Sequence, residues 1–268
     1  FSSTLFANFI SMNNGARSLG MGNAFVALSD QPTSIFSNPA GLARINQFYF
    51  IASHQQLYGI NNLHNSMIAM SFPTPFFRTG IGIQQINLLN TYVEKILYLS
   101  IAGIITPNNI PIRFGSSLKH ETVTVHKYEN ANNPSNFDLD IGLQVDLNSK
   151  LFLGYSMQYI LEPTFRFISS DNKIYQRSIL GACYYWRESV NFLIDYVYTV
   201  NGAYLNMGSE IWFYDVFSAR LGISNERLTT GFGLHAKKWI IDGAVIAHEE
   251  LGSNYRISFG LKLDLLNE

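Results

Sequence analysis

Tyr255-Arg-Ile-Ser-Phe-Gly-Leu-Lys-Leu-Asp-Leu265 alternates, residue by residue, between large apolar side chains and small or polar ones. The odd-numbered positions carry the apolar side chains, and the even-numbered positions carry arginine, serine, glycine, lysine and aspartate. A period of two places each set on one face of a β-strand. The stretch therefore predicts a strand whose two faces meet different surroundings.

The same alternation recurs through most of the chain, as in residues 139–147, 151–162 and 217–224. Turn residues between these segments divide the chain into about 14 strands. The predicted strands are 46–59, 62–72, 78–88, 91–106, 111–127, 138–147, 151–162, 174–187, 190–200, 203–213, 217–224, 228–237, 240–249 and 253–265. An even number of strands fits a closed antiparallel barrel.

The low content of charged residues indicates that the apolar faces of the strands point outward to lipid and not inward to a soluble core. Only 14% of the 268 residues are charged, against about 25% in a typical soluble domain. A soluble β-sandwich would carry more charge on its polar face. The mean hydropathy of +0.06 is low for a helical membrane protein, and the longest apolar run, 96–106, is about half of the roughly 20 residues that a membrane helix needs. We therefore predict an all-β fold, a 14-stranded antiparallel transmembrane β-barrel.

Residues 1–45 do not alternate, and we predict that they form a hatch, or plug, inside a barrel made by residues 46–268. Glycines at the start of this segment allow close backbone approach, and an Asn-Pro turn with a following glycine closes it. The candidate residues of the plug are Gly15, Arg17, Gly20, Gly22, Asn38, Pro39 and Gly41.

Charged residues on the inward faces of the last strands form a second candidate site. They are Glu210, Arg220, Asp242, Arg256, Lys262 and Asp264. Charges inside a barrel are usually paired, so we expect a ladder of ion pairs that fixes the wall and anchors the plug, with Arg17 as a partner of one carboxylate. A ligand-selective channel lining is the alternative.

Several function classes are excluded or disfavoured. A net charge of −1 without a basic stripe argues against nucleic-acid binding. The single cysteine, Cys183, excludes an internal disulfide, and the six histidines show no metal-ligand spacing. The Gly-x-Ser-x-Gly motif is absent, and no strand precedes the early glycines, nor does a Lys-Ser/Thr pair follow them. We predict no catalytic residue, cofactor or metal, and hence a protein that is not an enzyme.

The loops predict an orientation. The two longest, 129–137 and 163–171, follow odd-numbered strands and share one end of the barrel, whereas the turns at 148–150, 188–189 and 214–216 are short. Bacterial outer-membrane barrels have long outer loops and short periplasmic turns. We therefore expect a protein surrounded by outer-membrane lipid, which reached the outer membrane with a signal peptide that has been cleaved.

The N-terminal segment also resembles a known family. Gly15-Ala-Arg-x-Leu-Gly-Met-Gly-x-Ala-Phe-Val-Ala-Leu-x-Asp30 and Asn38-Pro-Ala-Gly-Leu-Ala43 are similar to the N-terminal signature of the PorV/PorQ family and, more distantly, of FadL-type outer-membrane barrels. Gly208-Ser-Glu210 with Arg220-Leu-Gly222 resembles the family's pattern near the C-terminus. The resemblance implies a 14-stranded barrel with an N-terminal hatch.

PorV-like members act in the type IX secretion system of the Bacteroidetes lineage. The resemblance implies an adaptor that works through protein contacts, with a larger translocon barrel, other secretion-complex subunits and cargo C-terminal domains as partners. Most outer loops of this chain are short, which favours a scaffold or accessory subunit over direct capture of cargo.

The alternative function is a FadL-like transporter of hydrophobic small molecules. In that case the hatch region around residues 15–38 would form the ligand pocket, and a gap in the wall would release the ligand sideways. Asn38-Pro39 and a set of apolar residues, which we expect to face inward, would matter most. The apolar residues of this set are Tyr49, Ile51, Tyr184 and Trp186. A structural barrel that only fills a position in a complex is a third possibility.

Overall fold

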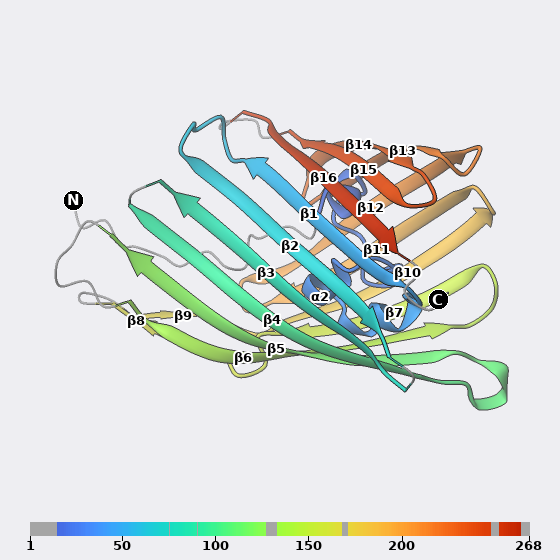
Figure 1. Cartoon of the computed structure of the whole chain (residues 1–268), viewed down its shortest axis with the longest axis horizontal. Coiled ribbons are helices and arrows are strands. Elements are labelled where there is room, and N and C mark those ends of the chain that lie inside the picture. Colours follow the sequence, from blue (N-terminus) through green and yellow to red (C-terminus); the bar gives the residue numbers. More distant parts are fainter. Residues whose placement is uncertain are drawn as a thin grey trace.

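A computed structural model of the chain describes residues 15–74, 76–89, 91–126, 133–167, 171–247 and 252–263. In this part of the chain, fourteen strands form one closed barrel in which every neighbouring pair is antiparallel (Figure 1). The barrel closes where the first strand pairs with the last, for example Ser53 with Ser258. The predicted fold class, a 14-stranded antiparallel barrel, is confirmed.

Its strands are β1 (Phe48–Gln56), β2 (Leu63–Pro73), β3 (Arg78–Leu88), β4 (Tyr92–Ile105), β5 (Ile112–Val125), β6 (Ser135–Asp146), β7 (Leu151–Gln158), β10 (Arg177–Arg187), β11 (Val190–Thr199), β12 (Gly202–Phe213), β13 (Phe217–Ser224), β14 (Arg227–His235), β15 (Trp239–Ile246) and β16 (Asn254–Leu263). The short helices are α1 (Ala16–Gly20), α2 (Ser34–Ser37), η2 (Pro39–Arg44) and η3 (Pro107–Asn109). Among the residues described, no helix has both the length and the apolar character to cross a membrane.

The alternation in β16 sorts its side chains as its sequence predicts. Tyr255 and Ile257 are 65% and 57% exposed on the outer surface, whereas Arg256 and Ser258 are 2% and 5% exposed and face inward. Large apolar residues cover most of the outside of the other strands in the same way. An outer surface of this kind suits contact with lipid hydrocarbon.

The two ends of the barrel differ. The end that we call inner carries the short turns at 147–150, 188–189 and 214–216, and β16 ends there (Figure 1). At the outer end, the connection from β7 to β10 contains an additional hairpin, β8 (Thr164–Arg166) with β9 (Asp171–Lys173).

The sequence did not predict this hairpin, because its three-residue strands are too short to show a period. An ion pair joins the two sides of the connection, with 2.6 Å between Lys173 Nζ and Glu162 Oε2. The hydrogen bond from Lys173 lowers the pKa of the Glu162 carboxyl group. Of the other long loop, 129–137, residues 129–132 lie outside the described residues, and β6 already begins at Ser135.

One prediction about the wall is wrong. Tyr184 and Trp186 are 45% and 56% exposed and point outward, whereas Cys183 is fully buried on the inward face of β10. Both faces of this strand are apolar, so hydrophobicity alone did not reveal which face is inside. Tyr49 and Ile51, by contrast, are 3% and 2% exposed and do face inward.

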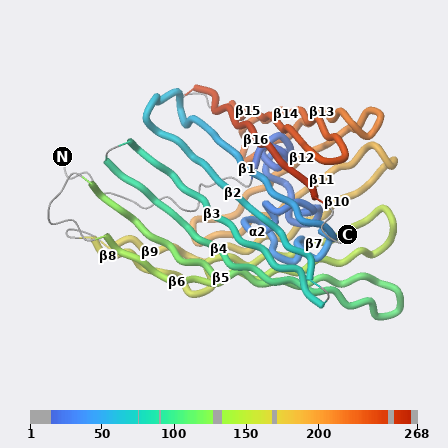
Figure 2. The backbone as a smooth tube through the Cα atoms, in the orientation of Figure 1, coloured from blue at the N-terminus to red at the C-terminus, as the bar shows by residue number. Residues whose placement is uncertain are grey.

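Residues 15–45 lie inside the ring of strands, nearer the inner end. Figure 2 shows this segment in blue, enclosed by strands from both halves of the chain. Helix α1 contacts β13 to β16, while η2 contacts β3 to β6 on the opposite wall. The segment is almost entirely buried.

Inward-facing glycines on neighbouring strands lie at the same height in the barrel, and this segment packs against them. They form register pairs between neighbouring strands: Gly115 with Gly142, Gly154 with Gly181, and Gly208 with Gly222. A Cβ atom on most of these glycines would overlap the backbone of residues 21–40. The repeated glycine on the inward faces therefore lets the segment lie directly on the wall.

Replacing Gly222 by valine should lower the free energy of unfolding by about 1–3 kcal/mol, because the new side chain would overlap the backbone of Met21 and Gly22. Urea titration of the protein in lipid vesicles would measure this change. Ala219→Val, on the outward face of the same strand, is the control and should have little effect. Equal losses in the two variants would contradict the packing described above.

Candidate functional site

The turn at Asn38 joins the inner segment to the wall. The Asn38 side chain donates to the carbonyl oxygens of Val26 (2.9 Å) and Leu143 (3.1 Å), and its Oδ1 accepts a hydrogen bond from the backbone N–H of Ala40 (3.2 Å). On the facing strand, a Cβ atom on Gly142 would overlap Asn38 Oδ1. Asparagine fits here because it supplies both donors and an acceptor in one short side chain.

The glycines and the proline predicted for the plug also lie at close contacts. Gly15 and Gly22 have φ of 113° and 65°, which favour glycine. A Cβ on Gly20 would come within 3.1 Å of the wall backbone, and one on Gly41 would overlap Ser29. Pro39 packs against the wall at Gly115 of β5.

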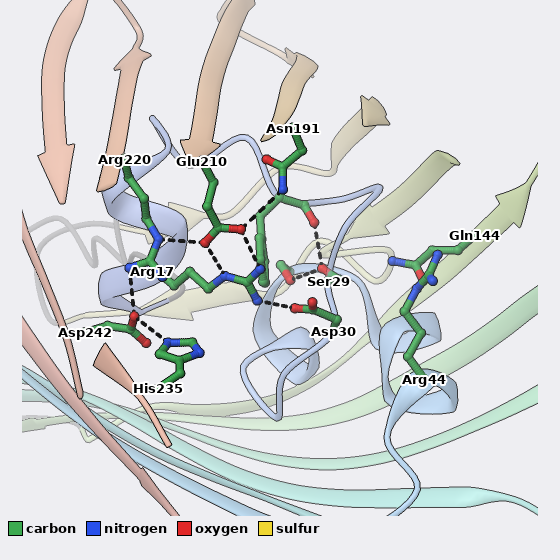
Figure 3. Close-up of polar contacts among 12 residues, drawn as sticks. Arg17, Ser29, Asp30, Arg44, Gln144, Asn191, Glu210, Arg220, His235 and Asp242 are labelled. Carbon is green, nitrogen blue, oxygen red and sulfur yellow. Dashed lines mark hydrogen bonds and ion pairs between the residues drawn. The ribbon is translucent and has the colours of Figure 1, made fainter. Parts of the chain in front are cut away.

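An unbroken chain of ion pairs connects the inner segment to the wall (Figure 3). Arg17 donates to both oxygens of Glu210, at 2.8 Å each, and to Asp30 at 2.6 Å. Arg220 donates to Glu210 at 2.8 Å and to Asp242 at 2.7 Å. Glu210 is thus held between two guanidinium groups, one from α1 and one from β13.

At the end of this chain of ion pairs, Asp242 Oδ1 lies within hydrogen-bond distance of His235 Nε2, at 2.9 Å. The Glu210 and Arg220 side chains are fully buried. The Trp212 ring lies 5.9 Å from the guanidinium carbons of both arginines. Paired charges with several hydrogen bonds each are the form in which buried ions are tolerated.

Two of the other predicted lumen charges, Arg256 and Lys262, make different contacts. Arg256 is buried and donates from two nitrogens to Gln55 Oε1, at 2.9 and 2.5 Å. Lys262 lies over the ring of Tyr49, with its Nζ 5.2 Å from the ring centroid. Asp264 lies outside the described residues.

The sequence analysis missed a second buried cluster. Lys119 Nζ lies 2.8 Å from both Asp138 and Asp140, 3.5 Å from Glu121, and 3.4 Å from the centre of the Tyr159 ring. A sequence signal exists, because the lysine and Glu121 are two residues apart on β5, and the two aspartates have the same spacing on β6. Pairing of Lys119 with Asp138 brings the four charges together.

Asp195 is a further residue that the sequence analysis did not single out. It occupies the wall position opposite Gly181, at the level of the inward glycines. Its Oδ2 accepts hydrogen bonds from the backbone N–H groups of Phe25 (2.8 Å) and Val26 (3.1 Å). A carboxylate thus supplies acceptors for N–H groups of the inner segment that would otherwise be unpaired.

Asp195→Ala should lower the free energy of unfolding by about 1–3 kcal/mol, because it leaves two buried N–H groups without an acceptor. Asp195→Asn keeps one side-chain oxygen and should lose less. Urea titration would rank the variants. The anchoring role would be contradicted if the alanine variant were as stable as the wild type.

Apolar side chains pack together inside the barrel, from the outer hairpin to the inner segment. Phe165 of β8 is fully buried, and it belongs to one continuous cluster with Ile96 and Tyr98 of β4 and Phe36 of α2. The rings of Phe36 and Tyr98 pack edge to face, with centroids 4.9 Å apart. The wall also contributes Tyr49, Ile51, Met67, Ala69, Ile86, Ala102, Val123, Val125 and Ile240 to this cluster, and the connection between β7 and β10 contributes Tyr159 and Ile174.

A cleft of about 610 Å³ opens at the inner end of the barrel. Arg17 and Asp30 line it from the inner segment, while Tyr49, Trp212 and His235 line it from the wall. The apolar cluster reaches this cleft, because Tyr49 belongs to both. Across the described ranges, no group of three His, Cys, Asp or Glu side chains could hold a metal ion.

Comparison with known proteins shows which solved structures share this fold. No protein-family model matches the sequence, and no curated protein matches it. Solved structures do match over almost the whole barrel. The monoaromatic hydrocarbon channel CymD superposes with a TM-score of 0.69 at 10% identity, covering 97% of this chain and 99% of that one.

Two further matches agree. The Ralstonia pickettii toluene transporter TbuX gives a TM-score of 0.64 at 12% identity, with 94% and 99% of the two chains covered. A FadL homologue of Pseudomonas aeruginosa gives 0.62 at 9% identity, with 93% and 98% covered. The chain therefore has the fold of the FadL-like outer-membrane β-barrels.

Proposed function

We propose that this protein is an outer-membrane channel for small hydrophobic molecules. The observation that supports this most is the continuous apolar cluster between Phe165 near the outer end and Phe36 of the inner segment. The interior of a general porin is polar and filled with water. An apolar lining instead favours solutes that gain by leaving water, by about 25 cal/mol for each Å² of apolar surface removed from it.

The proposal gives residues 1–45 the role of a hatch and residues 46–268 the role of the barrel. The described part of the hatch, from Gly15, rests on the inward glycines and is tied to the wall through Arg17 and Asn38. This segment is almost entirely buried and contacts both walls, so a solute that crosses the barrel would have to move past it. Local rearrangement of the hatch is thus the step that would control passage.

The fold supports the same proposal. CymD and TbuX are a hydrocarbon channel and a toluene transporter, and a barrel of the same fold with an apolar lining suits solutes of that chemistry. The apolar outer surface of the strands suits a location in the bacterial outer membrane. Identity of 10–12% to these proteins leaves the choice of solute to the lining residues of this chain.

An accessory subunit of a protein secretion complex is the second candidate function. Its support is the N-terminal signature, residues 15–43, together with the ion pairs that fix this segment to the wall. A scaffold has no need for a hatch that moves. Affinity purification from membranes followed by mass spectrometry separates the two, because only the secretion role requires a larger barrel to co-purify.

Binding of toluene tests the proposed channel. Radiolabelled toluene would be equilibrated with the protein in lipid nanodiscs, and protein-free nanodiscs would correct for partition into lipid. Ile96, fully buried in the apolar cluster, is the position to change. We expect Ile96→Gln to weaken binding at least tenfold and Ile96→Leu to keep it. Absence of binding above that of empty nanodiscs in the wild type would refute the proposal.

A further inference from the structure

Polar residues cover one part of the outer surface of the barrel, at the outer ends of β1 to β5. We call this surface the polar rim. It consists of the outward-facing residues His54, Gln56, His64, Ser66, Gln85, Asn87, Lys95, Thr122 and Thr124. Five of them form one row of register partners across the five strands: His54, Ser66, Gln85, Lys95 and Thr122.

The outward side chains become apolar over the next two rows of these strands. The first of these rows still contains His120, beside Ala52, Ile68, Ile83 and Leu97. Two rows closer to the inner end, the register partners are Phe50, Met70, Ile81, Leu99 and Leu118, all apolar. A lysine on the lipid-facing surface costs about 2–4 kcal/mol at the membrane midplane and about 0–1 near the interface. The polar rim therefore lies where the hydrocarbon ends.

The length of β4 leads to the same placement. Every outward residue from Leu97 to Ile105 lacks a polar side chain, and this nine-residue stretch is about the length that a transmembrane strand needs. Lys95 precedes it by two residues at the outer end. On the opposite wall, large apolar side chains are exposed near the outer end, as with Tyr196, Leu205 and Leu228.

The rim has charge of only one sign. All residues of β1 to β5 are described, and their outward faces carry Lys95, three histidines and neutral polar groups, but no carboxylate. The two acidic residues of these strands, Glu94 and Glu121, are buried on the inward face. Two of the histidines are side by side, since the rings of His54 and His64 have centroids 5.1 Å apart.

We propose that the polar rim binds the phosphorylated saccharide headgroup of a lipid in the outer leaflet. The amide, hydroxyl and imidazole groups suit the hydroxyls of a sugar, and Lys95 suits its phosphate. A protein partner fits less well, because the rim lacks the aromatic and arginine side chains that anchor protein interfaces. The inference depends on the outer-membrane location proposed above, and not on passage of a solute through the lumen.

Lipid binding to nanodisc-embedded protein tests this inference. The probe is a diphosphorylated disaccharide lipid, titrated into phosphatidylethanolamine nanodiscs and counted on the protein by native mass spectrometry. We expect Lys95→Gln to weaken binding about fivefold, as one basic residue near an anionic surface typically does, and Lys95→Arg to restore it. His54→Gln with His64→Gln should weaken binding of the same lipid as well.

Arg227→Gln is the matched control, since it removes one exposed positive charge at the outer end of β14, outside the rim. It should leave lipid binding unchanged. The inference is overturned if the dephosphorylated lipid binds equally well, or if Arg227→Gln has the same effect as Lys95→Gln. It is also overturned if the Lys95→Gln variant loses a bound protein while lipid binding is unchanged. Toluene binding, measured on the same variants, should be unaffected, so failure of this inference is distinguishable from failure of the channel proposal.

Discussion

Glu210→Ala is expected to lower the free energy of unfolding by about 3–5 kcal/mol, the cost of removing one partner from a buried ion pair. Glu210 accepts hydrogen bonds from both Arg17 and Arg220, and its side chain is fully buried. Its removal leaves two guanidinium groups with fewer compensating charges. Urea titration in lipid vesicles, followed by tryptophan fluorescence, would measure the loss.

Glu188→Ala is the control for that experiment. Glu188 is an exposed carboxylate in the turn between β10 and β11, at the same end of the barrel, and exposed ion pairs contribute at most about 1 kcal/mol. We expect this variant to unfold like the wild type. A loss below about 1 kcal/mol for Glu210→Ala would mean that the buried ion pairs do not fix the inner segment.

Deletion of residues 1–45 should convert the closed barrel into an ion-conducting pore. The described part of this segment fills the ring of strands at the level of the inward glycines, and its removal leaves glycines and polar side chains such as Asp195 and Gln144 facing the lumen. Single-channel recording in planar bilayers would show stepwise conductance in the deletion variant. Glu188→Ala, which keeps the segment, should stay closed. Unchanged conductance after the deletion would contradict the role of hatch.

The alternation of residue types made most of the barrel predictable. Of the predicted strands, 78–88 and 217–224 agree with the structure at both ends, because turn residues bound a clear period of two. The sequence also placed Glu210 and Arg220 on the inward face. It could not say which charges meet, because the register between strands also depends on the geometry of the turns that join them.

The errors have physical causes as well. Tyr184 and Trp186 were predicted on the wrong face because β10 is apolar on both sides. Gly181 is the residue that marks the inward face, through its contact with Ala27 of the inner segment. Lys119 was overlooked because its carboxylate partners, such as Asp138, lie on another strand and become neighbours only through strand pairing.

The N-terminal signature explains why the sequence alone favoured secretion over transport. Its glycines and Asn38 describe how a segment packs on a wall of inward glycines, and this packing is needed whether the barrel is a scaffold or a channel. The signature therefore predicts the fold better than the function. In the proposed channel, the apolar cluster, with residues such as Ile96 and Phe165, would carry the functional information.

Uptake of toluene across the outer membrane tests the proposed function most directly. Bacteria whose own hydrocarbon channels have been deleted would express the wild-type protein or the Ile96→Gln variant, and the initial rate of radiolabelled toluene uptake would be compared with that of a polar solute of similar size. The proposed function predicts that the wild-type protein accelerates uptake of toluene but not of the polar solute. The Ile96→Gln variant should lose this acceleration. Equal acceleration of both solutes, or no acceleration of toluene, would contradict the proposed function.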